Sequence, residues 1–180
     1  MSDKPITLQD LLGNEELSIL IEKANQCLEH IGYTDHGPRH VLYVSRIAAQ
    51  ILEELDYPER RVELARIAGY LHDIGNVVNR NNHGESGALL LYPLLRRLNM
   101  DISEVADITS AVGSHEVSAA KPVSDLSAAL IIADKVDAHR ARVRVNQYDP
   151  SDIHDRVNYA IKKTSVVADK MNRTITYSFT

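Results

Sequence analysis

Apolar residues recur every three or four positions along most of this chain, which is the spacing of one face of an amphipathic α-helix. The segment after Pro38 is the clearest case, because positions 41, 44, 47, 48 and 51 are all apolar. Breaks in the pattern and capping residues divide the chain into seven expected helices. These are a short helix that begins at the capping box of Thr7 and Asp10, and helices over 14–32, from Pro38, and over 58–73, 85–98, 103–113 and 125–139.

Three residues are expected to shape the ends and interiors of these helices. Ser103 should cap the sixth helix, and Gly75 should end the fourth helix in a left-handed conformation. Pro93 lies inside the fifth helix and should kink or split it, because proline has no backbone N–H to donate.

The pattern changes after position 161. The segments TSVVAD and RTITYSF are rich in β-branched and aromatic residues and flank a polar turn around 170–172, which predicts a β-hairpin. We find no internal repeat, low-complexity tract or linker in the sequence. It therefore predicts an all-α fold, a single helical domain over residues 1–180, with a small C-terminal β-hairpin at about 161–180.

Composition and charge exclude several classes of protein. Twenty basic and 25 acidic residues give a net charge of −5, which argues against a general nucleic-acid-binding surface. The single cysteine, Cys27, rules out an intramolecular disulfide and a cysteine-rich zinc site. The N-terminal residues lack the pattern of a signal peptide, and no stretch approaches the ~20 apolar residues of a membrane span. We therefore expect a cytoplasmic protein with no nucleic-acid or membrane partner.

Six histidine and aspartate residues stand out, most of them at the ends of expected helices. Each one alone would most often be a capping or surface residue. Together they form the mixed set of imidazole nitrogens and carboxylate oxygens that first-row transition ions accept, and helix ends can converge on one point in a bundle. The six residues are His40, His72, Asp73, His83, His115 and Asp134.

In their sequence context, these residues resemble the HD superfamily of metal-dependent phosphohydrolases. The family pattern is an early histidine, an adjacent His-Asp pair and a distant aspartate, found here in DHGPRHVLYV, LHDIGN and IIADKVDA. The histidines of NNHGESGA and AVGSHE match the two additional ligands of the dinuclear branch. The resemblance covers roughly residues 33–139, and it rests on all six elements in order rather than on the His-Asp pair alone.

The resemblance implies a division of labour among the ligands. His40, His72, Asp73 and Asp134 would hold a first ion, Asp73 would bridge to a second, and the two additional histidines would complete the second site. One or two divalent transition-metal ions per chain are expected (Fe, Mn, Zn, Ni or Co, with Mg as a further candidate). Two ions about 3.5–4 Å apart can activate a shared hydroxide that attacks phosphorus.

Three residues beside the ligands are candidates for contacting the substrate. Lys135 follows a ligand aspartate and could bind a substrate phosphate, while Arg39 immediately precedes His40 and His36 lies one turn before it. Asp73 and Lys135 are therefore the expected catalytic residues. Asp137 lies outside the family pattern, and we expect it only to help order the seventh helix.

Three functions are compatible with this ligand set. The leading hypothesis is hydrolysis of a phosphomonoester or phosphodiester, with a nucleotide as the favoured substrate. The alternative is a di-iron oxygenase acting on a small hydroxylated or phosphonate substrate, because relatives such as myo-inositol oxygenase use the same ligands with two irons. The third is a nucleotide-binding regulatory module, although the complete ligand set counts against a decayed site. The exposed edge of the hairpin could pair with another subunit, so a homodimer and a monomer are both compatible with the sequence.

Overall fold

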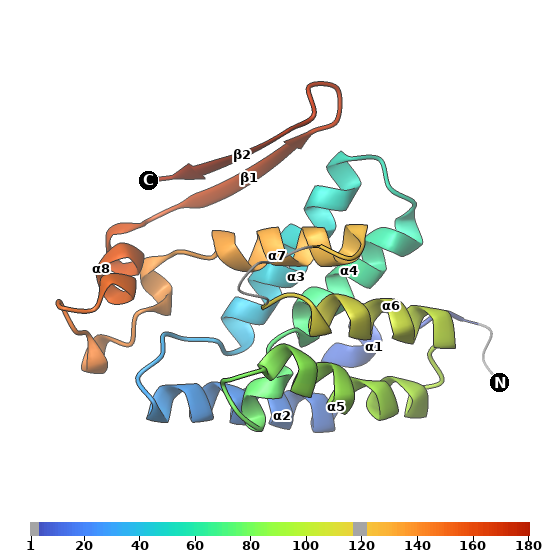
Figure 1. The fold of residues 1–180 in the computed structure, drawn as a ribbon, viewed down its shortest axis with the longest axis horizontal. Coiled ribbons are helices and arrows are strands. Elements are labelled where there is room, and N and C mark those ends of the chain that lie inside the picture. The colour runs from blue at the N-terminus through green and yellow to red at the C-terminus, as the bar shows by residue number, and fades with distance from the viewer. Residues whose placement is uncertain (1–3, 117–121) are drawn as a thin grey trace.

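In the computed structural model, which describes residues 4–116 and 122–180, the chain is mostly helical and ends in a two-stranded antiparallel sheet (Figure 1). The predicted fold class is therefore confirmed. The described elements are α1 (Leu8–Leu12), α2 (Glu15–His30), α3 (Pro38–Glu54), α4 (Glu59–Leu71), η1 (Ile74–Val77), α5 (His83–Arg97), α6 (Ile102–Gly113), α7 (Asp125–Val136), η2 (Arg140–Arg142), η3 (Val145–Gln147), α8 (Ile153–Ala160), β1 (Thr164–Asp169) and β2 (Thr174–Phe179), where η marks a short 3-10 helix.

Helices α3 and α4 form the centre of the fold and pack against each other more extensively than any other pair of elements. Helix α7 packs on both of them, and α6 packs on α4, α5 and α7. The hairpin runs along one side of this bundle, and α2 and α5 lie on the opposite side (Figure 1). Helix α8 sits apart at one end, beside η2.

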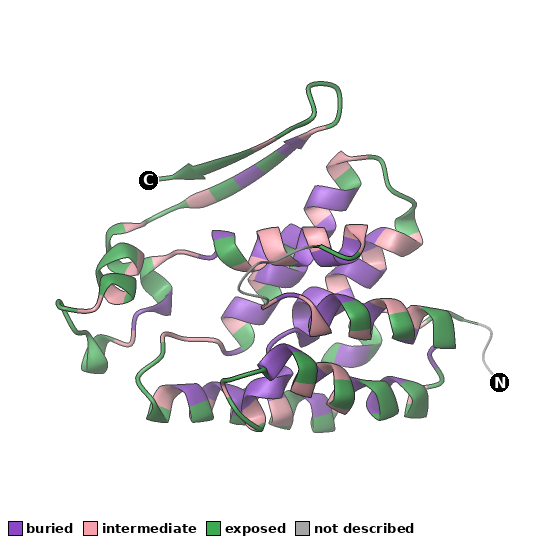
Figure 2. Ribbon diagram, viewed as in Figure 1, coloured by how far each residue is buried: buried purple, intermediate pink, exposed green. Residues whose placement is uncertain are grey.

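Many residues of α3 and α4 are buried, as the purple segments of these helices in Figure 2 show. The apolar positions that predicted the third helix, Val41, Val44, Ile47, Ala48 and Ile51, are all buried in α3. The two helices come unusually close at Gly69, because a Cβ atom there would lie 2.6 Å from the Cα atom of Ser45. Residues 40 and 72, near the facing ends of the two helices, are thereby held in one small region of the core.

The end of α4 differs from the sequence prediction. The helix ends at Leu71, the chain turns at residues 72 and 73, and Gly75 lies inside η1 without a positive φ angle. Gly75 is required for space instead, because a Cβ atom there would lie 1.9 Å from the carbonyl oxygen of His83 and 2.5 Å from the backbone nitrogen of Gly87. The absence of a side chain therefore allows η1 to lie against the first turns of α5.

Other helix boundaries also depart from the predictions. Helix α5 begins at His83 and continues through Pro93 to Arg97 as one helix. The cap of α6 is Asp101, whose side chain accepts a hydrogen bond from the backbone N–H of Ser103. The sequence did not predict α8, and no residue of this helix is buried. Its apolar side chains therefore give no buried stripe from which a helix could be recognised.

The hairpin is attached to the bundle through β1. Thr164 of β1 pairs with Phe179 of β2 at one end of the ladder, and Asp169 pairs with Thr174 at the other. Val166 and Ala168 of β1 are buried against the helices, whereas β2 contributes no buried residue. Among the described residues, no helix combines the length and the apolar composition that a membrane span requires.

Candidate metal centre

The six candidate ligands come from the ends of five helices that meet in the interior. His40 lies in the first turn of α3, and His83 is the first residue of α5. His72 and Asp73 directly follow α4, and His115 follows α6. Asp134 lies in the last turn of α7. The four histidines and Asp73 are buried, and Asp134 is partly buried.

Four of these residues point one atom each toward a common position. The Nε2 atoms of His40 and His72 lie 3.3 Å apart. Oδ2 of Asp73 lies 3.5 Å from Nε2 of His40 and 3.3 Å from Nε2 of His72. Oδ1 of Asp134 lies 3.4 and 3.8 Å from the same two nitrogens. Donors about 2.1 Å from one ion in tetrahedral geometry lie about 3.4 Å from one another. The donor atoms of His40, His72 and Asp134 all lie within 4.8 Å of one another, so these three residues could hold a divalent ion, with Asp73 beside both histidines.

A second group faces the other oxygen of the same carboxylate. Oδ1 of Asp73 lies 3.3 Å from Nε2 of His83, and that nitrogen lies 3.1 Å from Nε2 of His115. The two oxygens of Asp73 are thus directed at two different histidine groups. A carboxylate in this position can bridge two ions.

Hydrogen bonds on the outer side of each ring determine which nitrogen faces the centre. Nδ1 of His72 must donate to the carbonyl oxygen of Gly69, 2.9 Å away, and Nδ1 of His115 to that of Val112, 2.6 Å away. The Nε2 atoms therefore present lone pairs to the interior when the rings are neutral. Oδ2 of Asp73 is buried and has no hydrogen-bond partner within the described part of the chain. A cation would satisfy all of these atoms together.

The charges of the centre also favour a cation. Burial alone would raise the pKa of Asp73 and of Asp134, but the facing histidines hold both pKa values well below the usual range. Burial lowers the pKa of His115 to about 4, with a contribution from His72. Burial lowers the pKa of His40, but hydrogen bonds to Asp134, Asp137 and Asp73 raise it to about 9. At neutral pH the centre therefore holds two ionised carboxylates, a neutral His115 and a protonated His40, whose proton a bound ion would displace.

Three residues that the sequence pattern did not identify support this arrangement. Nδ2 of Asn76 donates to Oδ1 of Asp73 at 2.9 Å. Glu116 places a carboxylate oxygen 2.5 Å from Nδ1 of His83. Nη1 of Arg80 lies 3.5 Å from Glu116 and also contacts His83 directly, at 2.9 Å from Nδ1 and 3.2 Å from Nε2. Asn76 lies three residues after Asp73, a spacing at which side chains on a helical turn can meet, and that spacing was the available signal.

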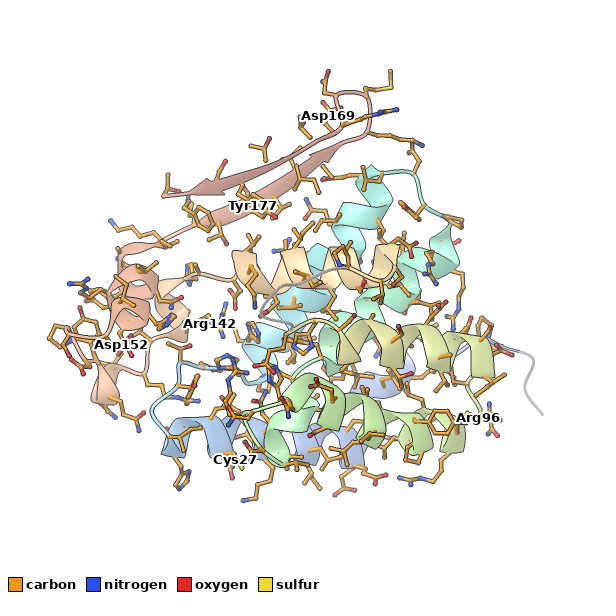
Figure 3. The ribbon with its side chains drawn as sticks, in the orientation of Figure 1. Cys27, Arg96, Arg142, Asp152, Asp169 and Tyr177 are labelled. Atoms are coloured by element: carbon orange, nitrogen blue, oxygen red, sulfur yellow. The ribbon has the colours of Figure 1, made fainter. Side chains whose placement is uncertain are left out.

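Two adjoining cavities of about 300 and 400 Å³ lie between the candidate ligands and α8. Both are lined by His36, Arg80, Arg142, His154 and Asn158, and we call them together the α8 hollow. Asp134 and Lys135 line its inner part. Figure 3 shows Arg142 between α8, which carries residues 153–160, and the start of α3. The α8 hollow therefore gives a space beside the candidate ligands that a small molecule could enter.

The structure places the three candidate substrate residues in different settings. The side chain of Lys135 is 66% exposed, and its Nζ lies 2.6 Å from Oδ2 of Asp134. His36 lines the α8 hollow, but Nδ1 must donate to Thr34 and Nε2 must accept from Arg142. Arg39 pairs with Asp137 and lines a separate cavity. Lys135 is thus the candidate whose charged group lies beside both the ligands and the hollow.

Known proteins give an independent comparison with this geometry. The family model for the HD domain matches residues 39–139, more than half of the chain. A solved structure, described as a predicted HD superfamily hydrolase from an uncultured Thermotogales bacterium, has a TM-score of 0.55 and 26% sequence identity. The similarity covers 74% of this chain and 75% of that one. No curated protein sequence matches this chain. The chain belongs to the HD domain family.

Proposed function

We propose that this protein is a metal-dependent phosphohydrolase that cleaves a phosphomonoester or phosphodiester, with a nucleotide as the favoured substrate. One observation carries the proposal: Oδ2 of Asp73 lies 3.3–3.5 Å from the Nε2 atoms of His40 and His72, while Oδ1 lies 3.3 Å from Nε2 of His83. The similarity to a structure described as a predicted hydrolase agrees with it.

The six candidate ligands divide between two ions in this proposal. His40, His72 and Asp134 would hold the first ion together with Asp73. Asp73 would reach the second ion through its other oxygen, with His83 and His115 as the remaining protein ligands. Divalent ions in such a site supply an activated water nucleophile and neutralise charge on phosphoryl oxygens.

Three cations of the α8 hollow could contact an anionic substrate, those of Lys135, Arg80 and Arg142. Four carboxylates also line the hollow, those of Asp134, Asp137, Asp152 and Asp155, and the first two of these are already paired. Asp134 pairs with Lys135 and faces His40, and Asp137 pairs with Arg39 and His40. Lys135 would contact a phosphoryl oxygen and orient the ester beside Asp73. A neutral polyol, as expected for an oxygenase substrate, would make no use of these cations.

The test begins with metal analysis of protein purified without chelator, followed by hydrolysis assays on nucleotides and on simple phosphate monoesters and diesters, in which phosphate is measured for the monoesters and the released alcohol for the diesters. Asp73→Ala should lose activity by at least about a hundred-fold, because one carboxylate contributes to both ion sites. Asp125→Ala is the matched control, because Asp125 forms an ion pair with Arg61 and is not among the candidate ligands. It should keep the metal content and the activity of the wild type.

Two results would overturn the proposal. The first is phosphatase activity in Asp73→Ala equal to that of the wild type, after contaminating enzymes have been removed. The second is oxygen consumption by iron-loaded protein without hydrolysis of any ester in the panel, which would favour the oxygenase instead.

A further inference from the structure

Asp137, the residue that caps the C-terminal end of α7, is completely enclosed and charged. Its side chain has no exposed surface, and Oδ2 lies 2.7 Å from Nδ1 of His40 and 2.5 Å from Nη2 of Arg39. Nε of Arg142 lies 3.8 Å from the same oxygen. Oδ1 is buried and has no hydrogen-bond partner in the regions that the structure describes. The carboxylate therefore contacts both His40 and Arg39 through the same oxygen, Oδ2.

A buried carboxylate is unfavourable unless cations and hydrogen bonds compensate for its lost solvation. Here the compensation comes from two arginines on different segments, Arg39 of α3 and Arg142 of η2. Arg142 also donates to the backbone carbonyl of Asp137 at 3.0 Å and to that of Asp35 at 3.1 Å. The fold thus maintains an ionised carboxylate behind a histidine whose other nitrogen faces Asp73 and Asp134.

A carboxylate behind a metal-binding histidine has two known physical effects. It fixes the tautomer and the orientation of the ring, and it makes the other nitrogen a stronger electron donor. Asp137 meets the geometric requirement, because the carboxylate accepts a hydrogen bond from Nδ1 of His40 and leaves Nε2 free to face the centre. Nδ1 of His72 and Nδ1 of His115 face neutral backbone carbonyls instead. Nδ1 of His83 also faces a carboxylate, but that of Glu116 is partly exposed, whereas that of Asp137 is fully buried.

We propose that Asp137 is a positioning residue that sets the affinity of the His40 side of the centre for a divalent ion, and that Arg39 opposes it. The inference rests on the proposed metal centre. Asp137 orients His40 and adds negative charge behind the ring. Arg39 contacts the same carboxylate oxygen, and its positive charge partly offsets the effect of the carboxylate on His40.

A purely structural ion pair would behave differently. If Asp137 and Arg39 only stabilised the fold, removing either one would lower stability, and the affinity for ions would fall in both variants or change in neither. The proposal instead requires opposite changes. Loss of Asp137 should weaken ion binding, and loss of Arg39 should strengthen it.

The experiment measures the dissociation constant for Zn²⁺ by competition with a chelator, using the full chain with its metal removed. Asp137→Asn keeps the shape of the side chain but removes its charge, and it should bind Zn²⁺ about 10- to 100-fold more weakly than wild type. Arg39→Gln removes a cation near the centre and should bind roughly three- to ten-fold more tightly. Asp125→Asn, which breaks an ion pair at the far end of α7, should match the wild type.

A Co²⁺-loaded sample gives a second readout. Its visible absorption depends on the donors around the ion, so Asp137→Asn should shift the spectrum while Asp125→Asn should not. Arg39→Gln keeps the test decisive if Asp137→Asn does not fold, because Arg39 is partly exposed. Equal or weaker binding in Arg39→Gln, or unchanged binding in a folded Asp137→Asn, would overturn the inference and leave the proposed function standing. A wild-type chain that binds no ion would overturn both.

Discussion

The side-chain amide of Asn76 donates to two oxygens of Asp73, with Nδ2 lying 2.9 Å from Oδ1 and 2.9 Å from the backbone carbonyl. The backbone N–H of Asn76 also donates to that carbonyl, at 3.0 Å. Asn76 is itself buried. These bonds fix the rotamer of Asp73, so that one oxygen faces His83 and the other faces His40 and His72.

Asn76→Ala should therefore weaken ion binding without removing any candidate ligand. We expect about 10- to 100-fold lower affinity for Zn²⁺ and a loss of about 1–3 kcal/mol in the free energy of unfolding, because a buried carboxylate loses a hydrogen-bond donor. Chelator competition and chemical denaturation would measure the two effects. Asn25→Ala is a matched control: Asn25 is also buried but bonds to the backbone of His36 and to Arg144. It should lose stability and keep its affinity.

His83→Ala should convert a two-ion centre into a one-ion centre. Nε2 of His83 faces Oδ1 of Asp73 and the ring of His115, and it belongs to the second group of donors alone. Elemental analysis should show metal content falling from two ions per chain toward one, with an unchanged helical circular dichroism spectrum. His30→Ala, a change at an exposed histidine of α2, should keep two ions. If His83→Ala and the wild type bind the same number of ions, the two-ion arrangement is wrong.

Lys135→Ala should affect the reaction without affecting ion binding to the same degree. Loss of one charge-assisted hydrogen bond to a phosphoryl oxygen costs about 1.5–3 kcal/mol, which corresponds to roughly ten- to a hundred-fold in kcat/KM. The rates would be measured on the best ester found in the substrate panel, at matched metal content. Lys23→Ala, on the exposed surface of α2, should leave kcat/KM unchanged. A Lys135→Ala variant with wild-type kcat/KM would remove Lys135 from the catalytic residues.

Ion binding at neutral pH should release a proton from His40. Burial lowers the pKa of His40, and so does Arg142, but hydrogen bonds to Asp134, Asp137 and Asp73 outweigh both and raise the pKa to about 9. Below pH 9 the metal-free ring is protonated, so an ion at Nε2 must displace a proton. Apparent affinity should therefore increase about tenfold per pH unit as the pH rises toward 9, and level off above it. The pKa values of Asp73 and Asp134 lie well below this range, so these residues release no proton.

Calorimetry in two buffers that differ in their enthalpy of ionisation would measure this release. At pH 7 we expect a buffer-dependent binding enthalpy equivalent to about one proton per chain, and at pH 10 almost none. Identical enthalpies in both buffers at pH 7 would show that His40 is neutral before the ion binds.

The sequence predicted the parts of the fold that depend on buried apolar faces. The spacing of Val41, Val44 and Ile51 identified α3, and the β-branched segments identified the hairpin. Helix α8 was not predicted, because its apolar residues, such as Ile153 and Val157, remain exposed and form no buried face. The prediction of a left-handed conformation at Gly75 was wrong. A glycine after a helix often adopts a positive φ angle, whereas Gly75 is required because a side chain there would collide with the backbone of α5.

The candidate site was predictable to the extent that its residues follow a family pattern. All six candidate ligands come together in the structure, although their roles as ligands remain a prediction. The residues that contact the candidate ligands from the outer side do not belong to the family pattern, and the sequence did not predict their roles. Asp137 follows Asp134 by three positions, and only the fold shows that it turns away from solvent and contacts His40. Arg142 acts through the backbone carbonyls of Asp137 and of the distant Asp35, interactions for which the sequence carries no signal.

The candidate ligands extend from His40 to Asp134, so that a bound ion would connect segments separated by more than half of the chain. An unfolded chain cannot hold these donors together, and the ion would therefore bind only the folded form. At a free concentration 100 times the dissociation constant, such selective binding adds about 2.7 kcal/mol to the free energy of unfolding. Proteases in a cell degrade chains that open transiently. The supply of metal would then set the lifetime and the abundance of the protein, in addition to whatever reaction it catalyses.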